Sequence, residues 1–313
     1  MVKRSNDTKS RMNVDLFSDI KIVDDGCYLK LPNLNSDKYR TYDPEYIVTG
    51  MIKTRRRKIN ELWKVFRGTQ DNDFLNQYKY DKNFSSRMWE MYIGVILLNN
   101  GCKINAKNNS HLDFFVNDSF YIECVYPQNA NCQDKPDYVK PLLRKNNITE
   151  RPEESFKTRI TSSIADKYRK YREKLENGSV NENVPYVLAI NTAFRDMPDG
   201  IVHSLLFGYG NTQILYQRDK SDFGTKVVAY DKESISYILK SFCKKVTIGY
   251  FENNEFDGIS AVICCNNHII NSSKEPGADC YIIRNPYAKN VLCNQINFIS
   301  EIYREDNFDG IFW

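Results

Sequence analysis

The stretch from His111 to Val125 contains two short β-prone runs that flank Asn117, Asp118 and Ser119. Turn-forming residues between two such runs predict a β-hairpin with a three-residue loop. If the loop centres on Asp118, residue 114 lies opposite residue 122, and residue 116 lies opposite residue 120. This register decides which side chains share a face of the hairpin, and it therefore constrains the whole sheet that the hairpin joins.

The predicted register gives the hairpin two unlike faces, because side chains alternate along a strand. One face is wholly apolar and consists of Leu112, Phe114, Val116, Phe120, Ile122 and Cys124. The other face pairs residue 115 with 121 and Asp113 with Glu123. Opposed Cβ atoms lie about 5 Å apart, so two carboxylates there repel each other. A shared hard cation such as Mg²⁺ would remove the repulsion, and we expect this face to form half of a metal site.

Length and composition are those of a globular protein of one large domain or two ordinary ones. The chain has 313 residues and a net charge of +4, which permits a nucleic-acid partner without arguing strongly for one. The nine cysteines form no CxxC pair, so we expect free thiols in a reducing compartment. No G-x-S-x-G turn and no phosphate-binding loop with Lys-Ser/Thr occurs in the sequence, which argues against a serine hydrolase and a nucleotide-binding domain.

The expected location is the cytoplasm. The first residues lack the apolar core of a classical signal peptide, and the sequence has no run of about 18 apolar residues that would span a membrane. Secretion by a route that does not use such a signal is left open.

Hydrophobic periodicity predicts an α/β core in which helices cover a mixed sheet. Helices are expected at 52–66, 84–99 and 153–176, and strands at 102–106 and 184–191, the latter buried and parallel. After residue 200 the expected elements are short. They are a helical turn at 201–207, a helix at 234–243, and strands at 213–217, 226–230, 246–251, 259–265 and 281–284.

Three regions are expected along the chain. Residues 1–45 form an irregular N-terminal extension, 46–195 the core, and 196–313 an α+β region continuous with the core. The connection 126–152 is long and rich in proline. A loop of that length is often functional, so it is interpreted either as a cover for the site or as an ordinary surface insertion.

Two further charged residues stand inside apolar stripes. Glu90 lies among the aromatic residues of the helix expected at 84–99, where a surface Glu at the margin of the stripe is the alternative. Lys167 follows Ile164 by three residues in the stripe of the helix expected at 153–176. A lysine there must pair with anions or extend to solvent. Carboxylates that hold a divalent ion, together with a lysine that offsets charge on phosphate, suit phosphodiester hydrolysis.

The order of these residues resembles the PD-(D/E)xK nuclease superfamily, and in particular its restriction-endonuclease-like members, over about residues 84–191. The pieces that carry the resemblance are Trp89-Glu90-Met91-Tyr92, Leu112-Asp113-Phe114 and Tyr121-Ile122-Glu123-Cys124-Val125. It implies a four-stranded mixed sheet flanked by helices and an endonuclease that cleaves nucleic acid with Mg²⁺ or Mn²⁺. Asp113 and Glu123 match the two metal-binding carboxylates, and Glu90 matches a helical Glu that some members add.

The sequence departs from the family pattern at two positions. Leu112 stands in place of a proline, and Val125 in place of the motif lysine. Some members supply the basic group from the following helix, where Lys167 is the first candidate and Arg159 the second. The resemblance thus implies a hydrolase with Glu90, Asp113 and Glu123 as metal ligands and Lys167 as a catalytic residue.

Nucleic acid, with DNA favoured, is the expected partner; no membrane partner is expected, and a homodimer is left open. Phosphate contacts are assigned to Arg55, Arg56, Arg159 and Lys170, and such contacts give affinity without sequence preference. The alternative is a catalytically inactive nuclease-fold protein that binds nucleic acid or protein, including a secreted bacterial factor in which the core serves another role. Val125 in place of the motif lysine is the feature that favours this alternative.

Overall fold

The computed structural model describes residues 15–23, 41–80, 83–105, 112–127, 153–193, 200–218, 225–240, 244–292 and 296–302. The chain divides into two compact units, which are described separately: unit 1 comprises 1–106 and 269–272, and unit 2 comprises 107–268 and 273–313. The core predicted at 46–195 therefore includes parts of both units. Residues 128–152 of the predicted connection lie outside the described residues. Among the helices described, none is long and apolar enough to cross a membrane.

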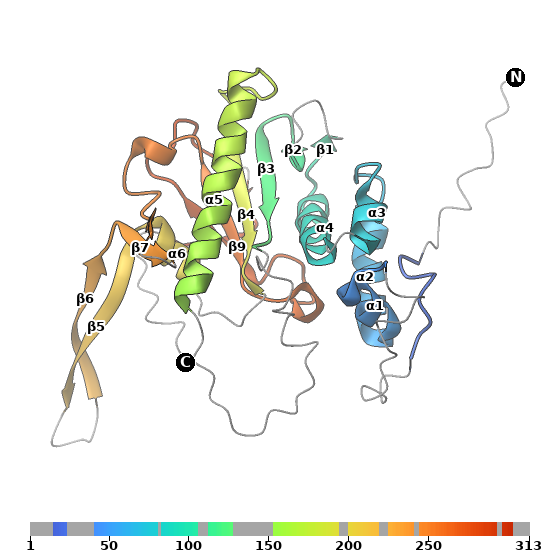
Figure 1. The fold of residues 1–313 in the computed structure, drawn as a ribbon, viewed down its shortest axis with the longest axis horizontal. Coiled ribbons are helices and arrows are strands. Elements are labelled where there is room, and N and C mark those ends of the chain that lie inside the picture. Colours follow the sequence, from blue (N-terminus) through green and yellow to red (C-terminus); the bar gives the residue numbers. More distant parts are fainter. Residues whose placement is uncertain are drawn as a thin grey trace, which may run out of the picture. The chain divides into compact units, whose positions relative to one another are not determined.

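Unit 1 is built from helices α1 (Pro44–Met51), α2 (Lys53–Phe66), α3 (Phe74–Lys79) and α4 (Phe84–Asn99) (Figure 1). The predicted helices at 52–66 and 84–99 are confirmed, the first beginning one residue later. Large aromatic side chains fill the interior of this unit, and they include Tyr46, Phe66, Phe74, Tyr78, Phe84 and Trp89. Burial of this much apolar surface is the main stabilising contribution to the unit.

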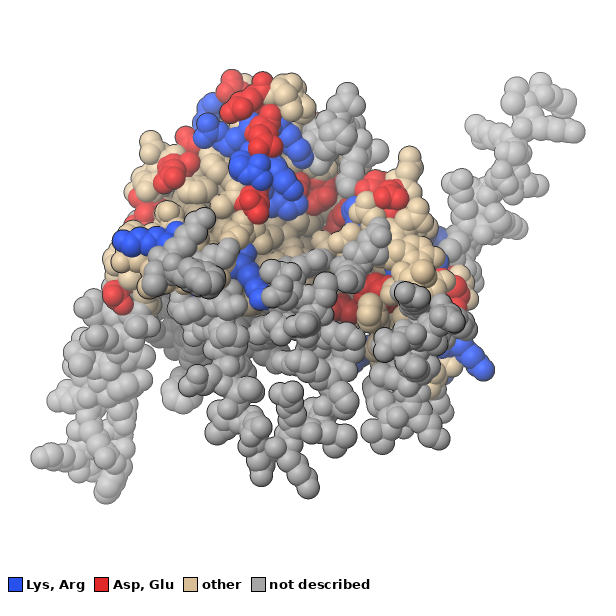
Figure 2. Space-filling view, in the orientation of Figure 1, with Lys and Arg blue, Asp and Glu red and all other residues tan. Residues whose placement is uncertain are grey.

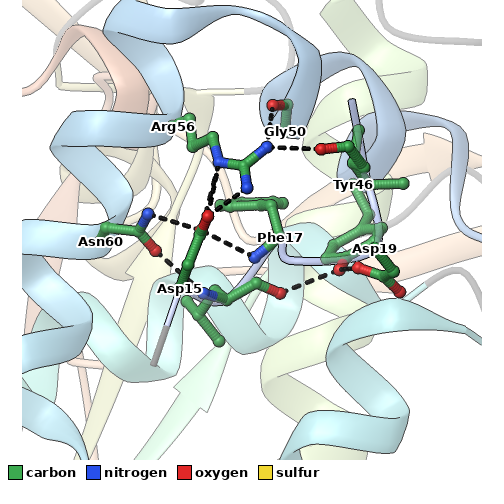
Figure 3. Close-up of polar contacts among 9 residues, drawn as sticks. Asp15, Phe17, Asp19, Tyr46, Gly50, Arg56 and Asn60 are labelled. Carbon is green, nitrogen blue, oxygen red and sulfur yellow. Dashed lines mark hydrogen bonds and ion pairs between the residues drawn. The ribbon is translucent and has the colours of Figure 1, made fainter. Parts of the chain in front are cut away.

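A buried guanidinium joins residues 15–20 to the helices of unit 1 (Figure 3). The Arg56 Nε atom donates to Asp15 Oδ2 at 3.0 Å, and Nη2 pairs with the same carboxylate. Arg56 Nη1 donates to the carbonyl oxygens of Ile20 at 2.6 Å and Gly50 at 3.1 Å. Arg56 was expected to contact phosphate, but its position in this network gives it a structural role.

Residues 15–20 are a packed part of unit 1 rather than a loose extension. Leu16, Phe17 and Ile20 are buried. A Cβ added to Gly50 would meet a ring carbon of Phe17 at 2.7 Å, so only glycine permits this close approach. The pattern of apolar residues in 15–20 was too short and irregular to predict this packing.

The main sheet is mixed and has seven strands in the order β1-β2-β3-β4-β9-β10-β11. Their bounds are β1 (Ile104–Asn105), β2 (Phe114–Val116), β3 (Phe120–Val125), β4 (Tyr186–Asn191), β9 (Ala261–Cys265), β10 (Cys280–Arg284) and β11 (Ser300–Glu301). Strands β3, β4 and β9 are parallel, whereas β2–β3 and β9–β10 are antiparallel. Every residue of β4 and β9 is buried. The α/β class and the buried parallel strand predicted at 184–191 are thus confirmed.

Helix α5 (Glu153–Glu176) has the predicted bounds and covers one face of this sheet in unit 2 (Figure 1). Its buried stripe contains Phe156, Ile160, Ile164, Tyr168 and Tyr171. The stripe packs against Tyr121 and Val125 of β3 and against Tyr186, Leu188 and Ile190 of β4. Residue 123 lies midway between Tyr121 and Val125 on β3, so by alternation its side chain also points toward α5.

The remainder of unit 2 contains α6 (Ile201–Leu206), the 3-10 helix η5 (Asn254–Phe256) and two hairpins. The hairpins pair β5 (Tyr209–Arg218) with β6 (Thr225–Ser234) and β7 (Tyr237–Lys240) with β8 (Lys244–Thr247). The helix predicted at 234–243 is wrong. Ile238 is 5 % exposed, whereas its neighbours Tyr237 and Leu239 are 43 % and 52 % exposed, and this alternation is that of a strand with one buried face.

Replacing Arg56 by Met should lower the free energy of unfolding at pH 7 by about 3 kcal/mol, because Asp15 loses its ion-pair partner and the carbonyl groups of Ile20 and Gly50 lose the Arg56 donor. Burial raises the pKa of Asp15, but hydrogen bonds from Arg56, Asn60 and the Phe17 N–H lower it more, so the net pKa is depressed. A depressed carboxyl pKa stabilises the fold above the ordinary value of about 3.9 and ceases to do so as the pH falls through the lower native value.

The difference between wild type and Arg56→Met should therefore narrow below about pH 4. Denaturant unfolding at pH 7 and at pH 3 measures it. Arg57→Met, at the exposed neighbouring position on α2, is the matched control and should change stability by less than about 0.5 kcal/mol. Equal effects of the two substitutions would show that the buried network does not stabilise unit 1.

Candidate active site

The hairpin β2–β3 has the predicted register. Its cross-strand partners are Phe114 with Ile122, Phe115 with Tyr121, and Val116 with Phe120. The turn residues Asn117 and Asp118 have φ values of 51° and 52°, a conformation that Asn and Asp tolerate better than other side chains. The Ser119 N–H donates to the carbonyl of Val116 at 2.9 Å and closes the turn.

Asp113 lies one residue before β2 and turns its carboxylate toward β3. Its Oδ2 atom accepts a hydrogen bond of 2.8 Å from the backbone N–H of Cys124. If the register continues by one residue, Asp113 lies opposite Glu123. The first acid of the predicted pair is thus fixed to the strand that carries the second.

Glu123 is a carboxylate between a sheet and a helix. It lies between Tyr121 and Val125, which share the α5-covered face of β3, and it is 8 % exposed. Its Oε1 atom accepts a hydrogen bond from Lys167 Nζ. Its Oε2 atom is buried without a hydrogen-bond partner among the residues described. Such an oxygen is costly to bury, and its environment suits a cation or a water molecule.

Lys167 reaches Glu123 from α5. It follows Ile164 by three residues, so the helical period places it beside the buried stripe. Its side chain is 29 % exposed, and its amine turns toward the sheet rather than out to solvent. The sequence left open whether Lys167 pairs with an anion or extends to solvent, and in the structure it pairs with Glu123.

Burial and nearby charges raise the net pKa values of both Glu123 and Lys167. Burial raises the pKa of Glu123, the Asp113 carboxylate raises it further, and Lys167 and Lys174 lower it; the net pKa is raised. Burial lowers the pKa of Lys167, but Glu123 and Asp113 raise it more, so the amine is held above its ordinary value. At neutral pH Lys167 is therefore charged, and the two acids still repel each other.

The sequence prediction missed Lys174, which also lies in the field of both acids. Burial lowers the pKa of Lys174, and attraction to Glu123 and Asp113 does not fully offset this effect. The available signal was its spacing, because it follows Lys167 by seven residues and so shares its face of α5. The site thus combines two carboxylates with two lysines, of which Lys167 has a raised pKa and Lys174 a lowered one.

Glu90 lies in unit 1, whereas Asp113, Glu123 and Lys167 lie in unit 2. It is 4 % exposed on α4, and Arg87 pairs with its carboxylate. The Arg87 Nη1 atom also lies 3.5 Å from the Oδ2 atom of Asp71. Glu90 is thus part of a charge cluster within unit 1, and its role as a metal ligand stays a prediction.

The remaining basic residues assigned to phosphate contacts differ in exposure. Lys170 is exposed, and Arg159 and Arg55 are partly buried. Figure 2 shows Lys and Arg side chains interleaved with Asp and Glu over the C-terminal half of α5. Arg169 there pairs with Glu173 at 2.6 Å, although both side chains are more than half exposed. Exposed pairs of this kind contribute little to stability and keep the surface charged.

Replacing Lys167 by Met, with divalent ions chelated, should lower the free energy of unfolding at pH 7 by about 2–3 kcal/mol. The variant leaves Glu123 without its donor and raises its pKa further. A carboxyl group whose native pKa is raised destabilises the fold as the pH rises above its unfolded value, so the loss should grow from about pH 4.5 upward and shrink below about pH 4. Denaturant unfolding across this range measures it.

The double variant Lys167→Met/Glu123→Gln should recover most of this loss, because no buried charge then remains at position 123. Lys170→Met, at an exposed position on the same helix, is the control for the loss of a lysine and should change stability by less than about 0.5 kcal/mol. Additive effects of the two substitutions in the double variant would contradict the coupling.

The chain matches no protein-family model, no curated protein and no solved structure. Functional inference therefore depends on the side chains that the fold brings together: the buried carboxylate of Glu123, its partner Lys167, and the neighbouring acid Asp113.

Proposed function

We propose that this chain is a metal-dependent nuclease of the PD-(D/E)xK type that hydrolyses phosphodiester bonds of nucleic acid, with DNA favoured. The observation that carries the proposal is the contact between Lys167 of α5 and Glu123 of β3. In the superfamily pattern the lysine that Val125 replaces has to come from elsewhere, and the following helix is one source. A lysine from that helix meets the second motif carboxylate here.

The order of elements supports a restriction-endonuclease-like core. Helix α4 is followed along the chain by the antiparallel hairpin β2–β3, then by α5, then by β4. Strand β4 pairs with β3 in the parallel sense, so α5 is the crossover connection that such a pair requires. This arrangement brings the two acids and the crossover helix to the same face of the sheet.

The residues fit a hard divalent ion. Asp113 and Glu123 would hold Mg²⁺ or Mn²⁺, since carboxylate oxygens are the ligands these ions prefer. The buried Oε2 atom of Glu123, which lacks a hydrogen-bond partner in the described part of the chain, is a suitable ligand atom. When bound, the ion supplies positive charge that polarises a phosphoryl oxygen and lowers the pKa of a coordinated water.

Lys167 has two tasks in this proposal. Its ammonium group orients the attacking water, and its charge offsets the negative charge that develops on the phosphate. Lys174, on the same face of α5, adds positive potential where the phosphate group would bind. Phosphoryl transfer asks the protein for positioning and electrostatic stabilisation rather than covalent chemistry, and these residue types provide both.

Purified full-length protein should cleave plasmid DNA, single-stranded DNA or RNA in the presence of Mg²⁺ or Mn²⁺ and not in excess chelator. Asp113→Ala and Glu123→Gln should each reduce the cleavage rate at least about 100-fold, and Lys167→Met by about 100- to 1,000-fold, since each removes a group that acts on the transition state. Gel assays with all three substrates measure the rates. Lys289→Met, at a position 53 % exposed and paired with Glu182, is the control and should keep wild-type activity.

Cleavage that persists in Asp113→Ala would assign the activity to a contaminant or to another site. Wild-type protein that binds nucleic acid but does not cut it would favour the inactive nuclease-fold alternative, for which Val125 in place of the motif lysine is the supporting observation.

Mg²⁺ should also raise the melting temperature of the wild-type chain, because an ion that binds only the native state stabilises it. The gain is about 2.7 kcal/mol at 100 times the dissociation constant. Glu123→Gln should melt at the same temperature with Mg²⁺ or with chelator, as a thermal-shift assay can measure. Equal stabilisation of wild type and variant would place the ion elsewhere.

A further inference from the structure

Two buried thiols face each other across the antiparallel strands β9 and β10. Cys265 and Cys280 are Cα partners, and they are 1 % and 3 % exposed. At the other end of the same ladder, the Asn285 N–H donates to the carbonyl of Ser260 at 3.0 Å. Asn285 and Ser260 are therefore a hydrogen-bonded pair. Alternation along the ladder makes Cys265 and Cys280 a non-hydrogen-bonded pair, whose Cα atoms are about 4.5 Å apart and whose side chains are closest.

A carboxylate accompanies this thiol pair. Asp279 precedes Cys280, and one ligand atom from each of the three residues lies within 4.8 Å of the other two. In a tetrahedral zinc site with Zn–S bonds of about 2.3 Å and Zn–O bonds of about 2.0 Å, the two sulfurs are about 3.8 Å apart and a sulfur and an oxygen about 3.5 Å apart. The three side chains therefore need only small shifts to share one ion.

The chemistry of this group differs from that of the carboxylate pair in the hairpin. A hydrogen bond to Cys265 and burial raise the pKa of Cys280 well above its ordinary value. A soft or borderline cation can replace two thiol protons, and two thiolates select such an ion over Mg²⁺. The resulting charge is then shared between the ion, two thiolates and one carboxylate.

We propose that Cys265, Cys280 and Asp279 bind one Zn²⁺ ion in unit 2. The ion takes the place of two thiol protons, which are released to solvent, and the fourth tetrahedral position is open to water. Such an ion joins the end of β9 to the start of β10 and closes the connection between them. This site is separate in ligand chemistry from the proposed Mg²⁺ site and does not depend on the nuclease proposal.

Titration of Co²⁺ into chelator-treated, full-length protein in a phosphine reductant tests the site. We expect thiolate-to-cobalt charge-transfer absorption that saturates at one ion per chain and disappears when Zn²⁺ displaces the cobalt. Cys265→Ser and Cys280→Ser should abolish the absorption. Asp279→Asn keeps both thiolates and should weaken binding at least about tenfold.

Cys264→Ser is the matched control. Cys264 is also buried and adjoins Cys265, but it lies on the opposite face of β9 because side chains alternate. It should keep the cobalt absorption, as should Glu123→Gln, so failure of the nuclease proposal leaves this result unaffected. Absence of the absorption in wild type, or its survival in Cys265→Ser, would overturn the proposal.

Melting temperatures measured with and without Zn²⁺ show whether each variant is folded and whether it binds the ion. Zn²⁺ should raise the melting temperature of wild type and of Cys264→Ser, with a larger shift at higher pH because two protons leave. At the same Zn²⁺ concentration it should raise the melting temperature of Asp279→Asn by less, because the variant binds the ion more weakly, and it should leave the melting temperature of Cys265→Ser almost unchanged. Recovery of a Cys265–Cys280 disulfide from protein isolated under reducing conditions without oxygen would also overturn the proposal, since oxidised cysteines cannot bind the ion.

Discussion

The ion pair between Glu123 and Lys167 explains how a sheet–helix interface can include a carboxylate. Glu123 lies on the α5-covered face of β3, and burial makes its charge costly. Lys167 compensates one oxygen, whereas the nearby Asp113 adds repulsion. A structure selected only for stability would place an apolar side chain at position 123. The proposed binding of a hard cation beside a phosphate group is a task for which two acids and a lysine at this interface would be needed.

Much of the fold could be predicted from local signals. The register of β2–β3 followed from the turn residues and the alternation of apolar positions, and the bounds of α4 and α5 followed from helical periodicity. The errors came from short segments. Residues 237–240 have apolar side chains that fit either period, and pairing with β8 decided for a strand. Residues 15–20 show no period at all, and their burial depends on Arg56 and Gly50, far away in the sequence.

The same distinction applies to the candidate site. Asp113, Glu123 and Lys167 were predictable because each breaks an otherwise apolar pattern in a defined element. Arg56 was assigned to phosphate contacts, whereas the structure has it buried and paired with Asp15, a partnership that no sequence pattern shows. The thiol pair was also missed, because its geometry depends on the register of β9 and β10, which are joined by the long connection 266–279 and not by a short hairpin turn. Charged residues that break a local apolar pattern could be predicted from the sequence, whereas contacts between segments far apart in the sequence could not.

The central claim is that one hard cation lies between Asp113 and Glu123 with the Lys167 amine beside it. Diffraction from crystals grown with Mn²⁺, recorded at a wavelength where manganese scatters anomalously, tests it most directly. The account predicts an anomalous peak about 2.0–2.2 Å from an oxygen of each carboxylate. A folded wild-type chain with no peak between these residues at saturating Mn²⁺, and with Lys167 still bound to Glu123, would contradict it.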